Sequence, residues 1–180
     1  MAAFSQDDEF GNRLDWKILR DGGVALYWRR EFLDQDIEKL RQERYQIFSF
    51  DASRWTSDKE MHGEFAQVLS FPAFYGKNLH ALNDSLDDLA VPEVGGVALA
   101  LIRFDAYAAG PGSDCVAAGG RSRAEILIDI FAGASRYFML TGRRFLTLVQ
   151  TDDPETCLGK LGGTSAVWNS KEWLNKNRGL

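Results

Sequence analysis

The sequence predicts an α/β protein with a mostly parallel sheet that helices cover. Two observations lead to this fold class. Short apolar runs that suit strands recur along the 180 residues, and stretches with helical spacing separate them. One of these runs, residues 97–102, is apolar without alternation, which is typical of a strand buried on both faces. Helices between successive strands place those strands side by side and parallel, so this alternation favours one sheet.

The N-terminal part contains one predicted strand and one predicted helix. Residues 1–16 are polar, and we expect them to be frayed. After two glycines, residues 24–28 form a short apolar and aromatic run that suits a strand. Asp34 then caps a predicted helix, in which Ile37 and Leu40 face inward.

A second strand and a second helix follow. Residues 45–51 alternate around an apolar centre and predict the strand. Ser57, with Glu60 three residues later, has the spacing of a capping box, which starts the helix. His62 lies beside the apolar face of that helix, and we interpret it as a partly buried structural or surface histidine rather than a functional one.

Residues 71–89 are the stretch around which the chain is organised. Pro72 ends the preceding element, and Gly76 permits a backbone conformation with φ above zero. Asn78 is a good helix cap, and the leucines behind it recur at helical spacing, which gives one buried stripe. The opposite face of this predicted helix is polar and acidic. It carries His80, Asn83, Asp84, Asp87 and Asp88.

The segment 105–123 is rich in alanine and glycine and is predicted to be a long loop with a helical turn near 106–109. Residues 119–122 precede a helix and could cradle a phosphate at the helix N-terminus. They lack the spacing of either nucleotide-binding motif, so we favour a plain linker.

The last third of the chain predicts a long helix and two more strands. Apolar residues in 125–140 have helical spacing, and Gly142 is the predicted stop. Residues 145–149 form another apolar run that suits a strand. A glycine-rich turn at 162–163 precedes a short final strand at 166–169.

Composition argues against several classes of function. Acidic residues outnumber basic residues by 26 to 21, so there is no global basic field for nucleic acid. Cys115 and Cys157 lie in predicted loops and lack a metal-binding spacing, so we expect no metal and no cofactor. No eighteen apolar residues run together and the N-terminus lacks a signal-peptide pattern, so we expect a cytoplasmic protein without a membrane span.

The string that begins at Pro72 resembles the signature of the barstar family, which contains an intracellular inhibitor of a secreted ribonuclease. The matching positions are Pro72, Phe74, Tyr75, Gly76, Asn78, Leu79, Ala81, Leu82, Asp84 and Leu86. The resemblance extends over about residues 45–151, and the order of elements agrees throughout. It implies a three-stranded parallel sheet made of the strands around Phe48, Leu99 and Leu148.

These boundaries predict a single barstar-like domain over residues 1–180. The family core comprises about residues 45–151, an extra strand–helix unit occupies residues 22–44, and a C-terminal extension occupies residues 152–180. We expect both additions to extend the same sheet, because neither could bury its aromatic side chains alone.

The resemblance implies that the aromatic turn and the acidic helix plug the active site of a nuclease. Phe74 keeps the aromatic ring of the turn without a tyrosine hydroxyl, and Asp84 keeps the acid that contributes most in the family. His80 replaces the first acidic contact, and Asn83 replaces a tryptophan. The predicted partner-binding residues are Phe74, Tyr75, Gly76, Asn78, His80, Asn83, Asp84, Asp87, Asp88 and Ile130.

The departures from the family pattern bear on the identity of the partner. Acidic contacts are missing at His80 and near Gly133, whereas Ile130 aligns with an apolar contact. We therefore expect a stoichiometric inhibitor, or immunity protein, of a ribonuclease other than barnase or of a nuclease toxin. Such a protein acts by binding and is not an enzyme.

Three other interpretations remain at this point. The fold could serve as a protein-interaction module or as a small-ligand-binding module, with residues 119–122 at the ligand. His80 and Asp84 are four residues apart on one helical face, where they could form a general base with its orienting acid. Tyr75 and Phe74 could each brace the turn from the core instead of contacting a partner.

Overall fold

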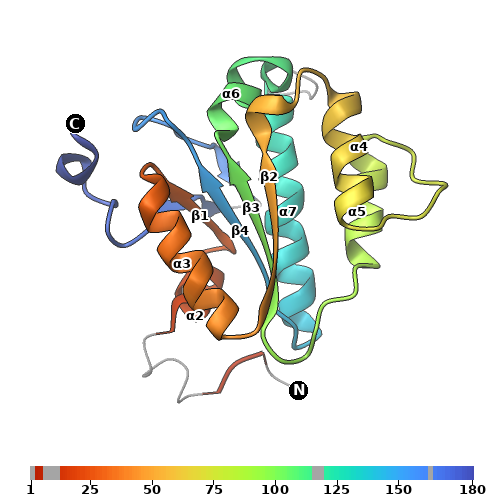
Figure 1. Ribbon diagram of the computed structural model, residues 1–180, viewed down its shortest axis with the longest axis horizontal. Helices are drawn as coiled ribbons and strands as arrows, with labels where there is room; N and C mark the ends of the chain where they lie inside the picture. The colour runs from red at the N-terminus through yellow and green to blue at the C-terminus, as the bar shows by residue number, and fades with distance from the viewer. Residues whose placement is uncertain (1–2, 6–12, 115–119, 162–163) are drawn as a thin grey trace.

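The computed structural model describes residues 3–5, 13–114, 120–161 and 164–180. These residues contain a five-stranded sheet in which every strand pairing is parallel (Figure 1). The strands lie in the order β2-β3-β4-β1-β7. Their bounds are β1 Val24–Tyr27, β2 Tyr45–Asp51, β3 Gly96–Ile102, β4 Phe145–Gln150 and β7 Val167–Trp168. The predicted α/β fold with a parallel sheet is confirmed.

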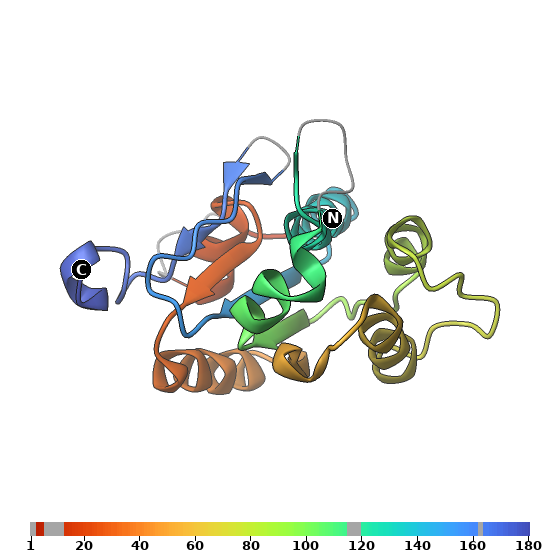
Figure 2. The ribbon, with the colours of Figure 1, turned by 90° about the horizontal axis from the view of Figure 1, so that it is seen from above.

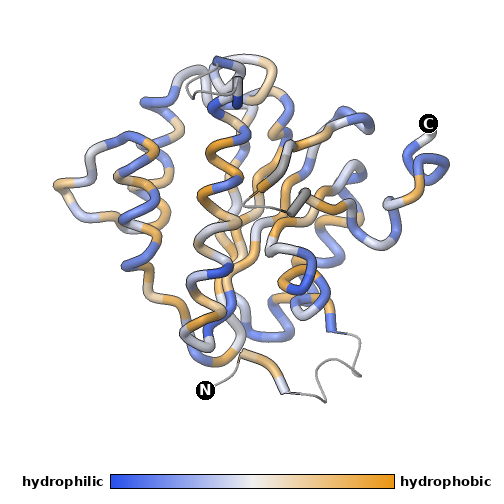
Figure 3. The backbone as a smooth tube through the Cα atoms, turned by 180° about the vertical axis from the view of Figure 1, so that it is seen from behind, coloured by the Kyte–Doolittle hydropathy of each residue, from blue (hydrophilic) through white to orange (hydrophobic). Residues whose placement is uncertain are grey.

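Helices cover both faces of the sheet and give the molecule three layers (Figure 2). α2 and α3 pack on one face, and α7 packs on the other with α4 and α5 beside it. The helices in the described residues are α2 Leu14–Arg20, α3 Arg30–Gln42, α4 Asp58–Val68, α5 Leu79–Asp87, α6 Phe104–Ala109 and α7 Arg123–Leu140. Apolar residues concentrate in the central strands and along α7 (Figure 3).

The central strand β3 contributes to both cores. Val97, Leu99 and Leu101 are buried on the face that α7 covers. Ala98 and Ala100 are buried on the face that α3 covers. Since each face of this strand is buried, both sets of alternating positions are apolar, which is why the sequence shows no alternation there.

The two additions to the family core join the same sheet, as predicted. β1 lies next to β4, with Val24 opposite Thr147. β7 lies on the far side of β1, with Ala25 opposite Val167. The strands around Phe48, Leu99 and Leu148 are the three neighbouring strands β2, β3 and β4.

The prediction that Asp34 caps the helix after β1 is wrong. α3 begins at Arg30, and Asp34 lies inside it and accepts from Arg30 Nε at 2.8 Å. The backbone N–H groups that precede the helix donate instead to the buried carboxylate of Glu172, from Trp28 at 3.0 Å and from Arg29 at 2.9 Å. This acceptor comes from the C-terminal segment, so the local sequence does not mark where α3 starts.

Caps of the other helices agree more closely with the sequence. Ser57 caps α4 and accepts from the backbone N–H of Glu60, as predicted. The Glu60 carboxylate, however, accepts from the backbone N–H of Thr56 at 2.7 Å instead of closing the capping box. Gly142 follows α7 with φ of 77° and ends it as predicted.

The segment predicted to be a long loop contains more structure than a helical turn. α6 begins at Phe104, and a 3-10 turn, η2 (Pro111–Ser113), follows it. Cys115 and Gly119 lie outside the described residues, as does the turn at 162–163. Two strands that were not predicted flank that turn and pair antiparallel, β5 Lys160–Leu161 and β6 Thr164–Ser165. Two further 3-10 turns are η1 Ala52–Arg54 and η3 Asn175–Arg178.

No helix in the described part of the chain is both long enough and apolar enough to cross a membrane.

Candidate functional site

The connection between α4 and α5 projects from the side of the molecule that lies away from α3 (Figures 1 and 2). Its two adjacent aromatic residues have opposite environments. The Phe74 side chain is 87% exposed, whereas the neighbouring Tyr75 is 7% exposed. Phe74 therefore offers its ring to solvent, and Tyr75 belongs to the core.

Tyr75 braces the turn against α4. Its hydroxyl lies 2.5 Å from Nδ1 of His62, and its ring packs 5.0 Å from the ring of Phe71. Burial lowers the pKa of His62 to about 4 and raises the pKa of Tyr75 above its usual value. His62 is thus neutral near pH 7 and has a structural role. From the sequence we expected a partly buried or surface histidine, but the side chain is buried. Of the two alternatives for Tyr75, the structure has the bracing one.

Gly76 has a different role from the predicted one. The residue with positive φ in this turn is Lys77, at 49°. A Cβ atom on Gly76 would lie 3.2 Å from Asn78 Nδ2 and 3.3 Å from the Ala81 Cβ. Glycine is therefore favoured here by the close approach of the helix start, because a side chain would push against it.

Asn78 fixes the start of α5, as predicted. Its Oδ1 accepts from the backbone N–H of Ala81 at 2.9 Å, and its Nδ2 donates to the carbonyl of Gly76 at 3.2 Å. One side chain thereby joins the turn to the first turn of the helix. The direction of α5 relative to the exposed Phe74 is set by these two bonds.

α5 is apolar behind and acidic in front. Leu82 and Leu86 are fully buried, and the helix packs against α7. The polar side chains predicted for the opposite face, His80, Asn83, Asp84, Asp87 and Asp88, are all exposed. In the described part of the chain, none of them makes a side-chain hydrogen bond or ion pair. No such bond joins His80 to Asp84, so the arrangement of a general base with its orienting acid is not formed.

A cleft of about 460 Å³ lies between the turn, α5 and the edge strand β2. Asp84 and Asp88, one helical turn apart, both line it. Phe74 and Phe71 line it from the turn, and Phe48 lines it from β2. An exposed aromatic ring and two unpaired carboxylates thus converge on one concave surface.

Asp87 lies on the other side of α5. It lines a second cleft, together with Tyr137 near the end of α7. Partial burial and the neighbouring carboxylates Asp84 and Asp88 raise the pKa of Asp87. Burial is the larger of the two causes, and the like charges of Asp84 and Asp88 add to it.

Ile130 is a partly exposed residue of α7 that packs against the core. α5 packs against α7, but Ile130 does not line the cleft that Asp84 and Asp88 line. Phe48 and Phe71, in contrast, line that cleft and were not predicted as site residues. Phe48 is partly buried on the edge strand β2, and its place at the cleft depends on the strand order, which the sequence does not show.

The N-terminus of α7 is occupied by the chain itself. Ser122 accepts from the backbone N–H of Glu125 at 3.2 Å, and the Glu125 carboxylate accepts from the backbone N–H of Ser122 at 2.8 Å. The hydrogen bond from the Ser122 backbone is the main cause that lowers the pKa of Glu125. The Glu125 carboxylate therefore occupies the helix N-terminus at which we considered a bound phosphate from the sequence.

The matching segment of the chain can now be compared with known families. A family model described as Barstar (barnase inhibitor) matches residues 45–150. The chain belongs to the barstar family. No curated protein gives a match. The barstar segment begins at β2 and ends with β4, so it contains the turn, α5 and α7 and leaves α2, β1, α3 and β7 outside.

Proposed function

We propose that this barstar-family protein is a stoichiometric inhibitor, or immunity protein, of a ribonuclease or nuclease toxin and that it acts inside the producing cell. The observation that supports this function best is the cleft beside α5. There, the exposed ring of Phe74 lies with the unpaired carboxylates of Asp84 and Asp88. The barstar family contributes the class of partner, since its description names an inhibitor of barnase.

The surface has the chemistry of an interaction hot spot. Aromatic side chains and desolvated charges carry most of the energy at the centre of protein interfaces. Phe74 is 87% exposed without a partner, and the carboxylates are held on a helix that Asn78 caps. A nuclease active site is basic because it binds phosphates, so carboxylates complement it and speed association.

We propose direct contact through Phe74, Gly76, Asn78, His80, Asn83, Asp84, Asp87, Asp88 and Ile130, with Tyr75 acting from within the turn. Asp84 has the central place, because it is the retained acid of the family pattern and lies at the cleft. His80 and Asn83 stand where the family has an acid and a tryptophan, so a partner other than barnase is proposed.

The test is inhibition of RNA cleavage by a panel of basic ribonucleases that includes barnase. We expect one inhibitor molecule to silence one molecule of a susceptible nuclease. Asp84→Asn should weaken that inhibition by about 3 kcal/mol, roughly a hundredfold, because the cationic group of the partner keeps its charge but loses the carboxylate that pairs with it. The matched control is Glu31→Gln, an exposed acid on α3 at the opposite face of the sheet.

Each variant is also unfolded in urea. The Asp84 side chain is exposed and makes no hydrogen bond in the described structure, so its replacement should change the free energy of unfolding by less than about 0.5 kcal/mol. Equal inhibition by wild type and Asp84→Asn would remove Asp84 from the interface. A different result would leave an interaction module without a nuclease target: no nuclease of the panel is inhibited, and wild type and Asp84→Asn recover the same non-nuclease protein in a pull-down.

That interaction module is the competing proposal. The observations that favour it are His80 and Asn83, which replace the acid and the tryptophan of the family pattern. An enzymatic function has less support, since His80 and Asp84 are not hydrogen-bonded and the proposed surface acts by binding alone. We propose no metal or cofactor for the site.

A further inference from the structure

A second cavity lies between α2, β1 and the C-terminal segment. Its volume is about 670 Å³, larger than that of the cleft beside α5 and within the range of about 300 to 1,000 Å³ that small-molecule sites occupy. All of its lining residues fall between 14 and 36 or between 167 and 173. They therefore lie outside the segment that the barstar model matches, and the cavity is built by α2 together with the two additions to the family core.

The walls of this cavity are largely apolar. Leu14 and Ile18 of α2, together with Val167 of β7, line it. Trp173 also lines it with a side chain that is 64% exposed. Trp168 contributes to the wall as a residue of β7, but it lies opposite Leu26 in the sheet and its ring packs with Leu26 in the core on the α7 side. The guanidinium of Arg178 lies 4.4 Å from the centre of the Trp168 ring, which holds that ring in place. The exposed indole of Trp173 at the cavity favours a flat ligand, because aromatic rings stack on flat apolar groups.

The buried polar groups of the cavity already have partners. The Tyr27 hydroxyl donates to Asp36 Oδ2 at 3.1 Å, and Lys39 Nζ donates to Asp36 Oδ1 at 2.8 Å. Burial and the Asp36 carboxylate raise the pKa of the Tyr27 hydroxyl, so it stays protonated and keeps donating. The Asp36 charge is compensated within the protein, so the cavity does not offer it to a cationic ligand.

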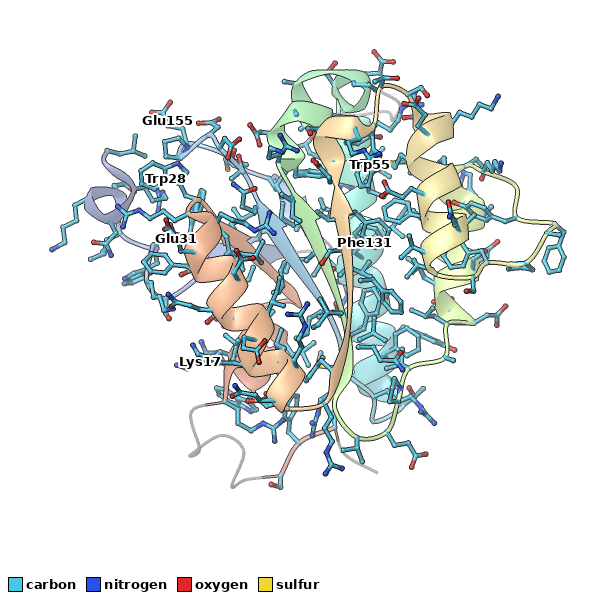
Figure 4. All side chains as sticks on the ribbon, in the orientation of Figure 1. Lys17, Trp28, Glu31, Trp55, Phe131 and Glu155 are labelled. Atoms are coloured by element: carbon cyan, nitrogen blue, oxygen red, sulfur yellow. The ribbon has the colours of Figure 1, made fainter. Side chains whose placement is uncertain are left out.

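Lys17 is the charged group that remains available. It lines this cavity and also a neighbouring polar groove of about 430 Å³, which Lys39 and Lys171 line as well. In the described residues, the Lys17 ammonium makes no ion pair or hydrogen bond. Arg20, in contrast, is paired with Asp21 at 2.7 Å. Figure 4 labels Lys17 beside the lower half of α3.

Basic side chains outnumber acidic side chains around the joined cavity and groove, although the protein has a formal net charge of −5. Lys17 is a partly buried residue next to apolar walls, and its ammonium attracts an acidic group that brings its own apolar body. A neutral ligand would leave that ammonium partly desolvated and unpaired, and a cation would be repelled by it.

We propose that this cavity binds a small molecule that joins a flat apolar ring system to one acidic group. The rings lie against Trp173, and the acidic group pairs with Lys17. Carboxylate, sulfonate and phosphate all meet this description. The site is separate from the nuclease-binding surface and does not depend on the function proposed for it.

The test compares two fluorescent probes that differ in their charge. 8-Anilinonaphthalene-1-sulfonate carries one sulfonate, and N-phenyl-1-naphthylamine has the same ring system without it. We expect the sulfonate probe to bind one molecule per chain and more tightly than the uncharged probe. Lys17→Gln should raise the dissociation constant of the sulfonate probe about tenfold and leave that of the uncharged probe unchanged.

Two further variants complete the experiment. Lys59→Gln removes an exposed lysine from α4 and should leave both probes unaffected. Trp173→Ala removes an exposed ring and should weaken both probes, while the far-ultraviolet circular dichroism stays that of the wild type. The proposal is overturned if the wild type binds neither probe, if both bind equally well, or if Lys17→Gln and Lys59→Gln have the same effect.

Discussion

His62 and Tyr75 are the residues that connect the exposed turn to the body of the protein. They join α4 to the turn through one hydrogen bond between two buried side chains. A backbone hydrogen bond from the Phe71 N–H to the carbonyl of Ala66 at 2.9 Å also joins the turn to α4. The His62–Tyr75 bond adds a side-chain connection next to Phe74. The stability of the turn should therefore depend on the protonation state of His62.

The pH dependence follows from the depressed pKa of His62. Burial holds that pKa at about 4, whereas a histidine in the unfolded chain has a pKa of about 6.5. The unfolded state binds the proton more readily, so the contribution of His62 is complete above pH 6.5 and is lost as the pH falls towards 4. Between pH 7 and pH 5, we expect His62 to account for a loss of about 2 kcal/mol in the free energy of unfolding.

Urea unfolding at the two pH values measures this loss. His62→Gln should remove it, since glutamine can bond to Tyr75 and does not titrate. His80→Gln, the replacement of the other histidine of the chain, should leave it unchanged because His80 is exposed. An equal pH dependence in wild type and His62→Gln would contradict the assignment.

Sequence reasoning at this scale identified the turn but not the orientation of its side chains. Phe74 and Tyr75 are adjacent aromatic residues, and nothing in their types separates the exposed ring from the buried one. The difference comes from His62, which lies thirteen residues before Tyr75 and forms a hydrogen bond with the Tyr75 hydroxyl. Irregular backbone has no fixed period, so the alternation that orients residues in a strand gives no guidance in this turn.

At the scale of elements, α5 presents the acidic surface and depends on its cap. Asn78→Ala removes the acceptor of the Ala81 N–H and should lower the free energy of unfolding by about 1 kcal/mol. Asn83→Ala replaces an exposed asparagine inside the same helix, where no cap is lost, and should change it by less than about 0.5 kcal/mol. Thermal or urea unfolding distinguishes the two variants, and equal effects would exclude capping as the cause.

Elements with strong periodicity were predicted well, and those that depend on distant partners were not. α5 and α7 follow from the helical spacing of their apolar residues, and β3 follows from an unbroken apolar run. The start of α3 does not, because the preceding N–H groups donate to Glu172 from the other end of the chain. In the candidate site, the exposed acids of α5 were predicted, whereas the contribution of Phe48 required the sheet order that puts β2 at the edge.

At the scale of the whole molecule, the two ends of the chain meet in one sheet. β1 lies between β4 and β7, so the first strand in sequence is enclosed by the last two strands of the sheet. The sequence predicted that both additions would extend the sheet, but apolar content alone does not determine their order. This order places the C-terminal segment against the start of α3, where Glu172 is fully buried.

Glu172 is the residue by which the C-terminal segment should affect global stability. Its carboxylate accepts from the backbone N–H groups of Trp28 and Arg29 and from Asn169 Nδ2 at 2.6 Å. Glu172→Ala would leave two backbone donors without this acceptor, so we expect the free energy of unfolding to fall by about 2 to 3 kcal/mol. The exposed Glu155 on the loop after β4 is the control, and Glu155→Ala should change that free energy by less than about 0.5 kcal/mol.

The shape of the unfolding curve tests the proposal that residues 1–180 form a single domain. If the additions and the barstar segment unfold cooperatively, Glu172→Ala should shift a single transition to a lower urea concentration. The curves from circular dichroism and tryptophan fluorescence should still coincide. If the C-terminal segment unfolds on its own, the substitution should instead split the curve, and the fluorescence of Trp168 and Trp173 should change first. A split curve would also place the cavity that Lys17 lines in a separately unfolding part, because β7 and Trp173 form its wall.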